Sequence, residues 1–290
     1  MTTYRISDMT RQQAKHDMID KHIELPPLAE PRARMLFAFL NQQGPTAAAN
    51  SELYTLVVTL VQLGMDTHDL IDTETTHRSE REMRSRQLKV LAGDFFSARF
   101  YQLLANAGQI DMIASISSAV CEVNRLKVNL YTRMRGLRVT AEDYFGYAVQ
   151  LRSEMFRQFA GMLEGASSRL WPELLHGVSR CEVALDELER CGSDSRFDKS
   201  WAYWHILQAG TEEERQALLS ETPSSSFIQS LLHKYDIRSQ LVAKLKHAAE
   251  GMKAAAAKLE SDKLQRELAS IADAMLARLA GGVPALNETR

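Results

Sequence analysis

Cysteine is scarce in this chain, and its spacing argues against two common structural roles. The three cysteines among 290 residues, Cys121, Cys181 and Cys191, form no C-x-x-C pair, and their number is odd. A structural zinc site and a disulfide framework are therefore not expected, and a reducing compartment fits.

An excess of charge and a long apolar run are also lacking. The formal net charge is -2 and the pI is about 6.5, so no global basic field is available for nucleic acid. No stretch reaches about 18 uninterrupted apolar residues, and the first residues, MTTYRISDMTRQQ, lack the apolar core of a signal peptide. We expect a cytoplasmic protein without a transmembrane segment, at most peripheral to a membrane, and no nucleic-acid partner.

Period-two patterns typical of strands are missing, whereas nearly every apolar pattern follows the helical period. The sequence therefore predicts an all-α fold of roughly ten helices in one domain, 1–290. Within it we expect N-terminal helices over 1–45, a core bundle over 51–190 and C-terminal helices over 200–280. One helix is expected to begin near Ser51, and the next to span about 87–106.

Several residues predict where individual helices begin, end or pack. Thr140 and the Thr211/Glu214 pair have the pattern of N-terminal caps. Pro172 suits a first helical turn, and one long helix is expected over about 227–259. A seam for another helix is predicted from residues that alternate at spacings of four and three, Leu264, Leu268, Ile271 and Met275.

An acidic cluster follows the apolar helix that begins near Ser51. His68, Asp69 and Asp72 are spaced so that all three side chains share one face of a helix. Carboxylates placed in this way can bind Mg²⁺, but an imidazole is a poor ligand for that hard cation. The plain alternative is a solvated helix end that binds nothing.

Three short motifs carry a family resemblance. They are 22–26 (HIELP), 63–69 (LGMDTHD) and 86–95 (RQLKVLAGDF). With these motifs the chain resembles the small, first component of two-component heptaprenyl diphosphate synthases. The resemblance implies an isoprenoid-synthase-like helical bundle that is inactive alone and sets product chain length.

The resemblance also implies the partner, the substrates and the metal. The partner would be the catalytic subunit, component 2, which carries the Asp-Asp-x-x-Asp clusters and holds Mg²⁺. The complex would bind prenyl diphosphate and elongate farnesyl diphosphate with isopentenyl diphosphate, for the menaquinone side chain. On this chain itself no catalytic residue and no metal are expected.

The departures from active synthases support that expectation. His68 replaces the first aspartate of their first cluster, and Arg78 is the one arginine kept from the following Arg-Arg-Gly. Arg152-Ser153 is the nearest counterpart of their Lys-Thr pair. The nearest counterpart of their second cluster is 186–189 (DELE), with Arg190 where its last aspartate would stand. Losing several charge-stabilising groups removes a few kcal/mol of catalysis for each.

Aromatic and basic residues follow the degenerate cluster. Phe95, Phe96, Phe100 and Tyr101 are candidates for a tunnel wall that limits chain length or for the subunit interface, and ordinary core residues are the alternative. Basic residues of the same region could contact a diphosphate or the partner, or lie in a solvated loop: Arg78, Arg81, Arg84, Arg86 and Lys89.

Three other functions stay open at this point. His68-Asp69 could belong to an HD-type metal phosphohydrolase, with His22 as the upstream ligand. Asp69 and Asp72 could instead serve a diverged prenyltransferase that works by itself. A helical scaffold without prenyl chemistry is the third. Metal and partner binding discriminate among them.

Overall fold

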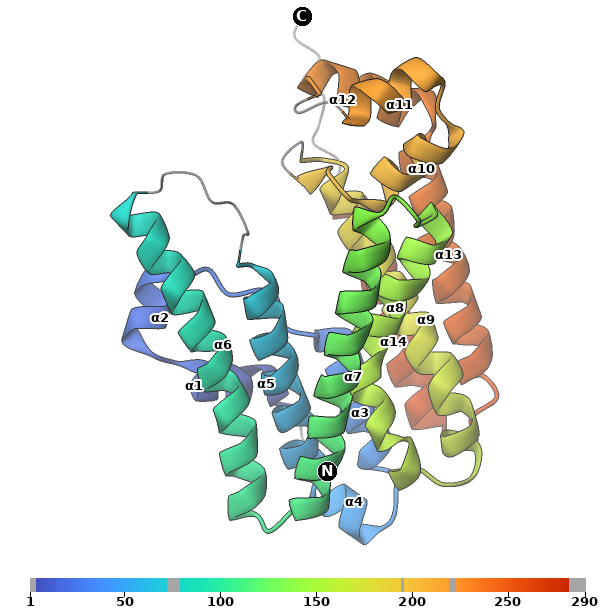
Figure 1. The fold of residues 1–290 in the computed structure, drawn as a ribbon. Helices are drawn as coiled ribbons and strands as arrows, with labels where there is room; N and C mark the ends of the chain where they lie inside the picture. Colours follow the sequence, from blue (N-terminus) through green and yellow to red (C-terminus); the bar gives the residue numbers. More distant parts are fainter. Residues whose placement is uncertain (1–3, 72–78, 194–195, 220–222, 282–290) are drawn as a thin grey trace, which may run out of the picture. The chain divides into compact units, whose positions relative to one another are not determined.

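The computed structural model describes residues 4–71, 79–193, 196–219 and 223–281, and these form helices and no β-strand (Figure 1). The all-α prediction is confirmed. The described residues contain fourteen α-helices where about ten were expected, because the shortest helices carry too few residues for a visible period. Their bounds are α1 Ile6–Ala14, α2 Asp17–His22, α3 Glu30–Leu40, α4 Pro45–Ala49, α5 Ser51–Asp69, α6 Glu80–Asn106, α7 Ile110–Arg135, α8 Ala141–Arg157, α9 Gly165–Arg190, α10 Trp201–Ala209, α11 Glu212–Leu219, α12 Ser225–Lys234, α13 Ile237–Ala256 and α14 Asp262–Gly281.

The helices group into two compact units. Unit 1 comprises residues 1–120 and 158–168, and unit 2 comprises 121–157 and 169–290. Unit 1 holds α1 to α6 and the first part of α7, whereas unit 2 holds α8, most of α9 and α10 to α14. A single domain over 1–290 stays a prediction, and each unit is considered by itself below.

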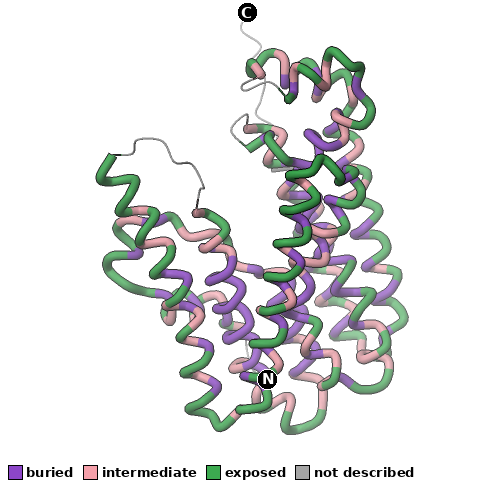
Figure 2. The backbone as a smooth tube through the Cα atoms, in the orientation of Figure 1, coloured by how far each residue is buried: buried purple, intermediate pink, exposed green. Residues whose placement is uncertain are grey.

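Helix α5 is the central helix of unit 1. From Tyr54 to Met65 every residue is buried, as the almost continuous purple of this segment in Figure 2 shows. A helix that is apolar nearly all round must be covered on several sides, and α1, α3 and α6 provide that cover. The predicted helix start near Ser51 is confirmed.

Glycine allows α6 to approach α5 closely. A Cβ built on Gly64 would lie 3.0 Å from both the carbonyl oxygen of Gly93 and Oγ of Ser97. The first of these atoms belongs to backbone, so it cannot move without shifting α6. The two helices therefore depend on this position for their spacing.

We expect Gly64→Ala to lower the free energy of unfolding by about 1–3 kcal/mol, because the added methyl group forces α5 and α6 apart. Gly251→Ala is the matched control. Gly251 is an exposed residue inside α13, and a Cβ there meets nothing within 4 Å. The control should gain about 0.5–1 kcal/mol from helix propensity. Urea denaturation measures both, and equal effects would contradict the close approach.

Helix α6 begins earlier than predicted. Residues 80–86 are helical and not a charged loop, because Ser79 and Glu82 form a capping box. The backbone N–H of Ser79 donates to Glu82 Oε2 at 2.8 Å, and the N–H of Glu82 donates to Ser79 Oγ at 3.3 Å. The S-x-x-E pattern was visible in the sequence, and it was overlooked among the surrounding charges.

Unit 2 corrects two further boundaries. Helix α9 starts at Gly165, so Pro172 lies inside the helix and not in its first turn. The helix expected over 227–259 is two helices, α12 and α13, which break at Asp236. Asp236 has φ +46°, a left-handed conformation that aspartate tolerates better than most residues.

Other predictions for unit 2 are confirmed. Thr140 accepts the N–H of Asp143, and Thr211 and Glu214 form reciprocal capping bonds. The predicted seam is buried where α14 packs on α13, with Leu264, Leu268, Ile271 and Met275 all at most 3% exposed. Within the described ranges, no helix has the length and apolar character that a membrane crossing needs.

Candidate functional site

The end of α5 places His68 against α6. A Cβ on Gly93 would lie 2.5 Å from Nε2 of His68, so the imidazole lies on the surface that the glycine leaves free. The same Nε2 lies 3.4 Å from Oδ1 of Asp94. The glycine and aspartate of the Leu-Ala-Gly-Asp run thus accommodate a histidine, where the resemblance places a metal-binding aspartate.

The residues beside His68 are arranged around the carboxyl end of α5. Asp69 is exposed and is the last residue of the helix. Lys89 of α6 donates from Nζ to the carbonyl oxygen of Leu70 at 3.2 Å, which places a cation at the negative end of the helix dipole. Asp72 and Arg78 lie outside the described residues.

A row of hydrogen-bonded polar side chains extends from the interior of unit 1 toward this end of α5. Arg32 of α3 is only 1% exposed, and its Nη1 donates to Oε1 of Gln62 at 3.4 Å. Nε2 of Gln62 donates in turn to Oδ1 of Asp66 at 2.8 Å. Sequence reasoning missed this row, because the sequence does not distinguish buried Arg32 from half-buried Arg34 in the same helix.

The three motifs of the resemblance meet in one core. Ile23 from the first motif, Leu63 from the second and Ala92 from the third are buried together with Phe96. Leu25, Leu88 and Phe95 pack against this cluster. The three motifs therefore pack together in unit 1. They lie far apart in the sequence, so the sequence alone did not reveal this contact.

The four candidate aromatic residues of α6 differ in their surroundings. Phe96 and Phe100 are buried, at 0% and 7% exposed. Phe95 is half-buried, and the guanidinium carbon of Arg99 lies 5.2 Å from its ring centroid. Tyr101 is 56% exposed. Burial thus separates two core residues from one residue that is available to a partner.

The counterpart of the second aspartate cluster lies at the end of α9 in unit 2, and arginine side chains pair with its carboxylates. Asp186 is paired with Nη2 of Arg152 at 3.4 Å and with Nη2 of Arg196 at 3.1 Å. Arg152 is the nearest counterpart of the lysine that holds diphosphate in active synthases. Here that cation neutralises a carboxylate of its own chain.

Glu187, next along α9, is a structural acceptor. Its carboxylate, 2% exposed, accepts from Tyr144 Oη at 2.9 Å and from the backbone N–H of Trp201 at 2.7 Å. Burial raises the pKa of Glu187, although nearby Arg190 and both hydrogen bonds act in the opposite direction. These bonds attach the start of α10 to α9 and α8.

Arg190 completes this network at the position of the missing last aspartate. Its Nη1 donates to Tyr144 Oη at 2.9 Å and lies 3.4 Å from Oε1 of Glu187. Its Nε and Nη2 donate, each at 3.0 Å, to the carbonyl oxygens of Arg196 and Asp198. A guanidinium with several rigid donors suits such a role, and it holds the connection between α9 and α10.

The acidic residues of α9 therefore face different partners. Glu189 pairs with Arg278 of α14, whereas Asp186 and Glu187 contact the groups described above. Magnesium needs several oxygen ligands converging on one point, and these carboxylates do not fit that requirement. Among the described residues, no group of three or more histidine, cysteine, aspartate or glutamate side chains could hold a metal ion.

Comparison with known proteins relates this geometry to a family. The sequence model for "Heptaprenyl diphosphate synthase (HEPPP synthase) subunit 1" matches residues 16–176, more than half of the chain. The chain belongs to this family. The resemblance carried by the three motifs is thereby confirmed, and with it membership of a prenyltransferase family of isoprenoid biosynthesis.

A curated relative agrees with the subunit 1 family. Heptaprenyl diphosphate synthase component 1 of Geobacillus stearothermophilus is 38% identical over 88 residues. The matched part makes up 30% of this chain and 38% of that relative. The chain thus matches well under half the length of the relative.

Solved structures show that this subunit 1 family member has the fold of polyprenyl synthases. The decaprenyl diphosphate synthase of Rhodobacter capsulatus superposes with a TM-score of 0.69 at 16% identity, over 94% of each chain. A polyprenyl synthase of Caulobacter crescentus, complexed with calcium and isoprenyl diphosphate, gives 0.73 at 14% identity, over 94% of this chain and 93% of that one. The isoprenoid-synthase fold predicted from the sequence is confirmed.

Proposed function

We propose that this chain is the non-catalytic, chain-length-determining subunit of a heterodimeric heptaprenyl diphosphate synthase. The catalytic partner, component 2, would bear the Asp-Asp-x-x-Asp clusters and Mg²⁺, and would elongate farnesyl diphosphate with isopentenyl diphosphate for the menaquinone side chain. The observation that carries the proposal is the arginine pairing of the second acidic cluster. The positive charges of Arg152, Arg190 and Arg196 lie beside these carboxylates and oppose the binding of a metal cation there.

The first cluster supports the same conclusion by its chemistry. An imidazole replaces a carboxylate at position 68, and its Nε2 lies 3.4 Å from Oδ1 of Asp94. Mg²⁺ prefers oxygen ligands, so His68 and Asp69 are a weak donor set. Ionisation of an allylic diphosphate needs charge neutralisation by metal ions and cations together. Both halves of that machinery are altered in this chain.

An exposed apolar line on α6 supports partner binding. Met83, Val90 and Tyr101 are 50%, 40% and 56% exposed. Their spacings of seven and eleven residues bring them back to the same side of a helix. In this proposal the partner covers this side of α6. We therefore assign Tyr101 to the interface, within the role proposed above.

The buried aromatic residues of the same helix would act on chain length through packing. Phe96 contributes to the core with Leu63 and Ala92, and Phe100 is buried on α6 as well. Bulky residues at fixed positions can limit the apolar space that a growing chain may fill. In this proposal Phe95, which is half-buried beside Arg99, is the residue most able to line such a space.

Whether this chain is catalytically inactive is tested directly by measuring metal-dependent diphosphate binding to the chain alone. We expect isothermal titration of inorganic pyrophosphate in the presence of Mg²⁺ to give no saturable binding, since the available donors are too few. A catalytic synthase with both clusters intact is the positive control. Saturable, Mg²⁺-dependent binding that Asp69→Asn abolishes would contradict the proposal and favour a self-sufficient prenyltransferase.

A further inference from the structure

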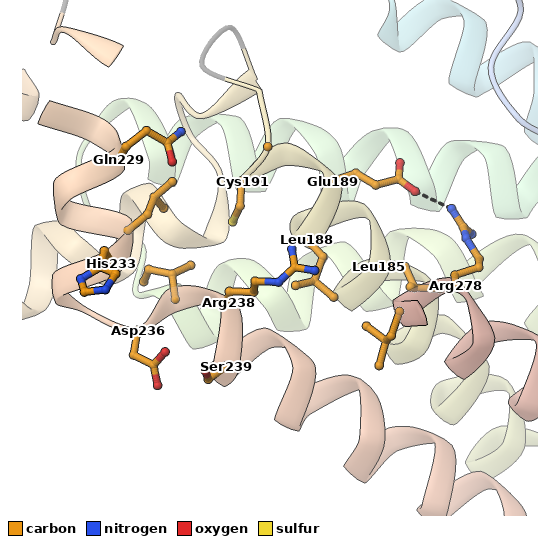
Figure 3. Close-up of a pocket in the computed structure, with 14 residues that line it drawn as sticks. Leu185, Leu188, Glu189, Cys191, Gln229, His233, Asp236, Arg238, Ser239 and Arg278 are labelled. Atoms are coloured by element: carbon orange, nitrogen blue, oxygen red, sulfur yellow. Dashed lines mark hydrogen bonds and ion pairs between the residues drawn. The ribbon is translucent and has the colours of Figure 1, made fainter. Parts of the chain in front are cut away.

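A cavity in unit 2 has no role in the function proposed above. It has a volume of about 900 Å³ and lies between the end of α9, α12, the start of α13 and the end of α14 (Figure 3). This volume falls within the range of ligand sites in proteins. The acidic residues that contact Arg152 and Tyr144 do not line it.

The floor of this cavity is apolar. Leu185 and Leu188 of α9 and Ile237 of α13 are buried, and half-buried Leu232 and Leu279 extend the apolar lining. Cys191 also lines it, and burial raises the pKa of its thiol to about 12. The thiol is therefore protonated and unreactive at neutral pH.

The mouth of the cavity carries basic groups from three helices. His233 comes from α12, Arg238 from α13 and Arg278 from α14. Arg278 is engaged by Glu189, whereas Figure 3 shows Arg238 extending from α13 toward Leu188. Asp236, the other acidic residue of the lining, lies between His233 and Ser239 in the same view.

We propose that this cavity binds a phosphorylated long-chain amphiphile, with the apolar chain on the leucine floor and the phosphate at Arg238. An apolar floor next to exposed guanidinium donors matches a ligand with an alkyl or isoprenyl tail and an anionic head. Two sources share this chemistry: a free prenyl or alkyl phosphate, and an anionic phospholipid of a membrane. The site shares Glu189 with the acidic cluster at 186–189, but not the carboxylates that contact Arg152 and Tyr144, so it does not depend on the function proposed above.

The test uses the full chain with dodecyl phosphate as the probe, below its micelle concentration, and dodecanol as the uncharged comparison. We expect one site per chain by titration calorimetry and weaker binding of dodecanol. Arg238→Gln should raise the dissociation constant for dodecyl phosphate about ten- to a hundredfold, since it removes a charge-assisted hydrogen bond. Leu279→Ser should weaken both probes. The control Arg266→Gln, an exposed arginine of α14 outside the lining, should change neither.

Vesicles distinguish the two sources. Flotation with phosphatidylcholine vesicles, with and without phosphatidic acid, tests the membrane lipid; binding that requires phosphatidic acid and is lost in Arg238→Gln assigns the site to that lipid. Binding of the monomeric probe alone assigns it to a free phosphate. Equal dissociation constants for the unmodified chain and Arg238→Gln, or no binding in either format, would overturn the proposal. Circular dichroism of each variant verifies that the helices are intact.

Discussion

Replacing Glu187 with alanine is expected to lower the free energy of unfolding by about 3–5 kcal/mol. The change leaves Arg190 without its buried counter-charge, and the Tyr144 hydroxyl and the Trp201 N–H lose their acceptor. Removing one partner of a buried ion pair costs this much because the other charge remains in a poorly solvated place. Urea denaturation of the purified chain measures the loss.

Glu189→Ala is the matched control for this variant. Glu189 lies two residues further along α9, but its side chain is 53% exposed and pairs with an equally exposed Arg278. A surface pair contributes between 0 and about 1 kcal/mol. A loss of the same size in both variants, or a negligible loss in Glu187→Ala, would contradict the structural role assigned to Glu187.

Glu187 also predicts a pH dependence. Burial raises its pKa above the ordinary value of 4.5, so the folded chain keeps this proton to higher pH than the unfolded chain does. The contribution of Glu187 to stability therefore falls as pH rises from about 4.5 through the raised pKa. In Glu187→Gln this part of the fall should vanish, whereas Glu189→Gln should leave it unchanged. Unfolding midpoints measured across this pH range test the sign.

The second large effect is expected at Tyr101, on association with the catalytic partner. Tyr101→Glu should raise the dissociation constant of the complex about thirtyfold or more, because tyrosine at the centre of an interface is worth about 2 kcal/mol and a buried unpaired charge adds a penalty. Titration calorimetry with the partner measures it. The folding of unit 1 should be unaffected, since the side chain is 56% exposed.

Leu219→Glu is the control for the Tyr101 prediction. Leu219 is a similarly exposed apolar residue, 51%, at the end of α11. It should leave association unchanged. Equal weakening by both variants would indicate a general effect of added negative charge, and no weakening by Tyr101→Glu would remove α6 from the interface.

Local chemistry explains which parts of this fold could be predicted from the sequence. The helical period of α5 and the capping pairs at Thr140 and Thr211 depend on residues three or four positions apart, and all were found. The break at Asp236 was missed, because the left-handed conformation of a single aspartate leaves the apolar period on either side intact. Ser79 shows that a local signal can also be hidden by surrounding charges.

For the candidate site, the sequence predicted only the positions at which this chain departs from active synthases. The substitution by His68 and the arginine at position 190 are visible in the sequence, but their partners are not. Asp94 is separated from His68 by 26 positions and Tyr144 from Arg190 by 46. Such contacts depend on the packing of α5 on α6 and of α8 on α9, so no short spacing encodes them. The structure was therefore needed to show that Arg190 holds the connection between α9 and α10.

The central claim, that this chain contributes to elongation only together with a catalytic partner, is tested most directly by product formation. The assay contains labelled isopentenyl diphosphate, farnesyl diphosphate and Mg²⁺, with this chain alone, with a partner bearing both aspartate clusters alone, and with the mixture. The account predicts one discrete long-chain product in the mixture and none from this chain by itself. Robust product from this chain alone would contradict it, because His68, Asp69 and Asp72 would then form a working metal site.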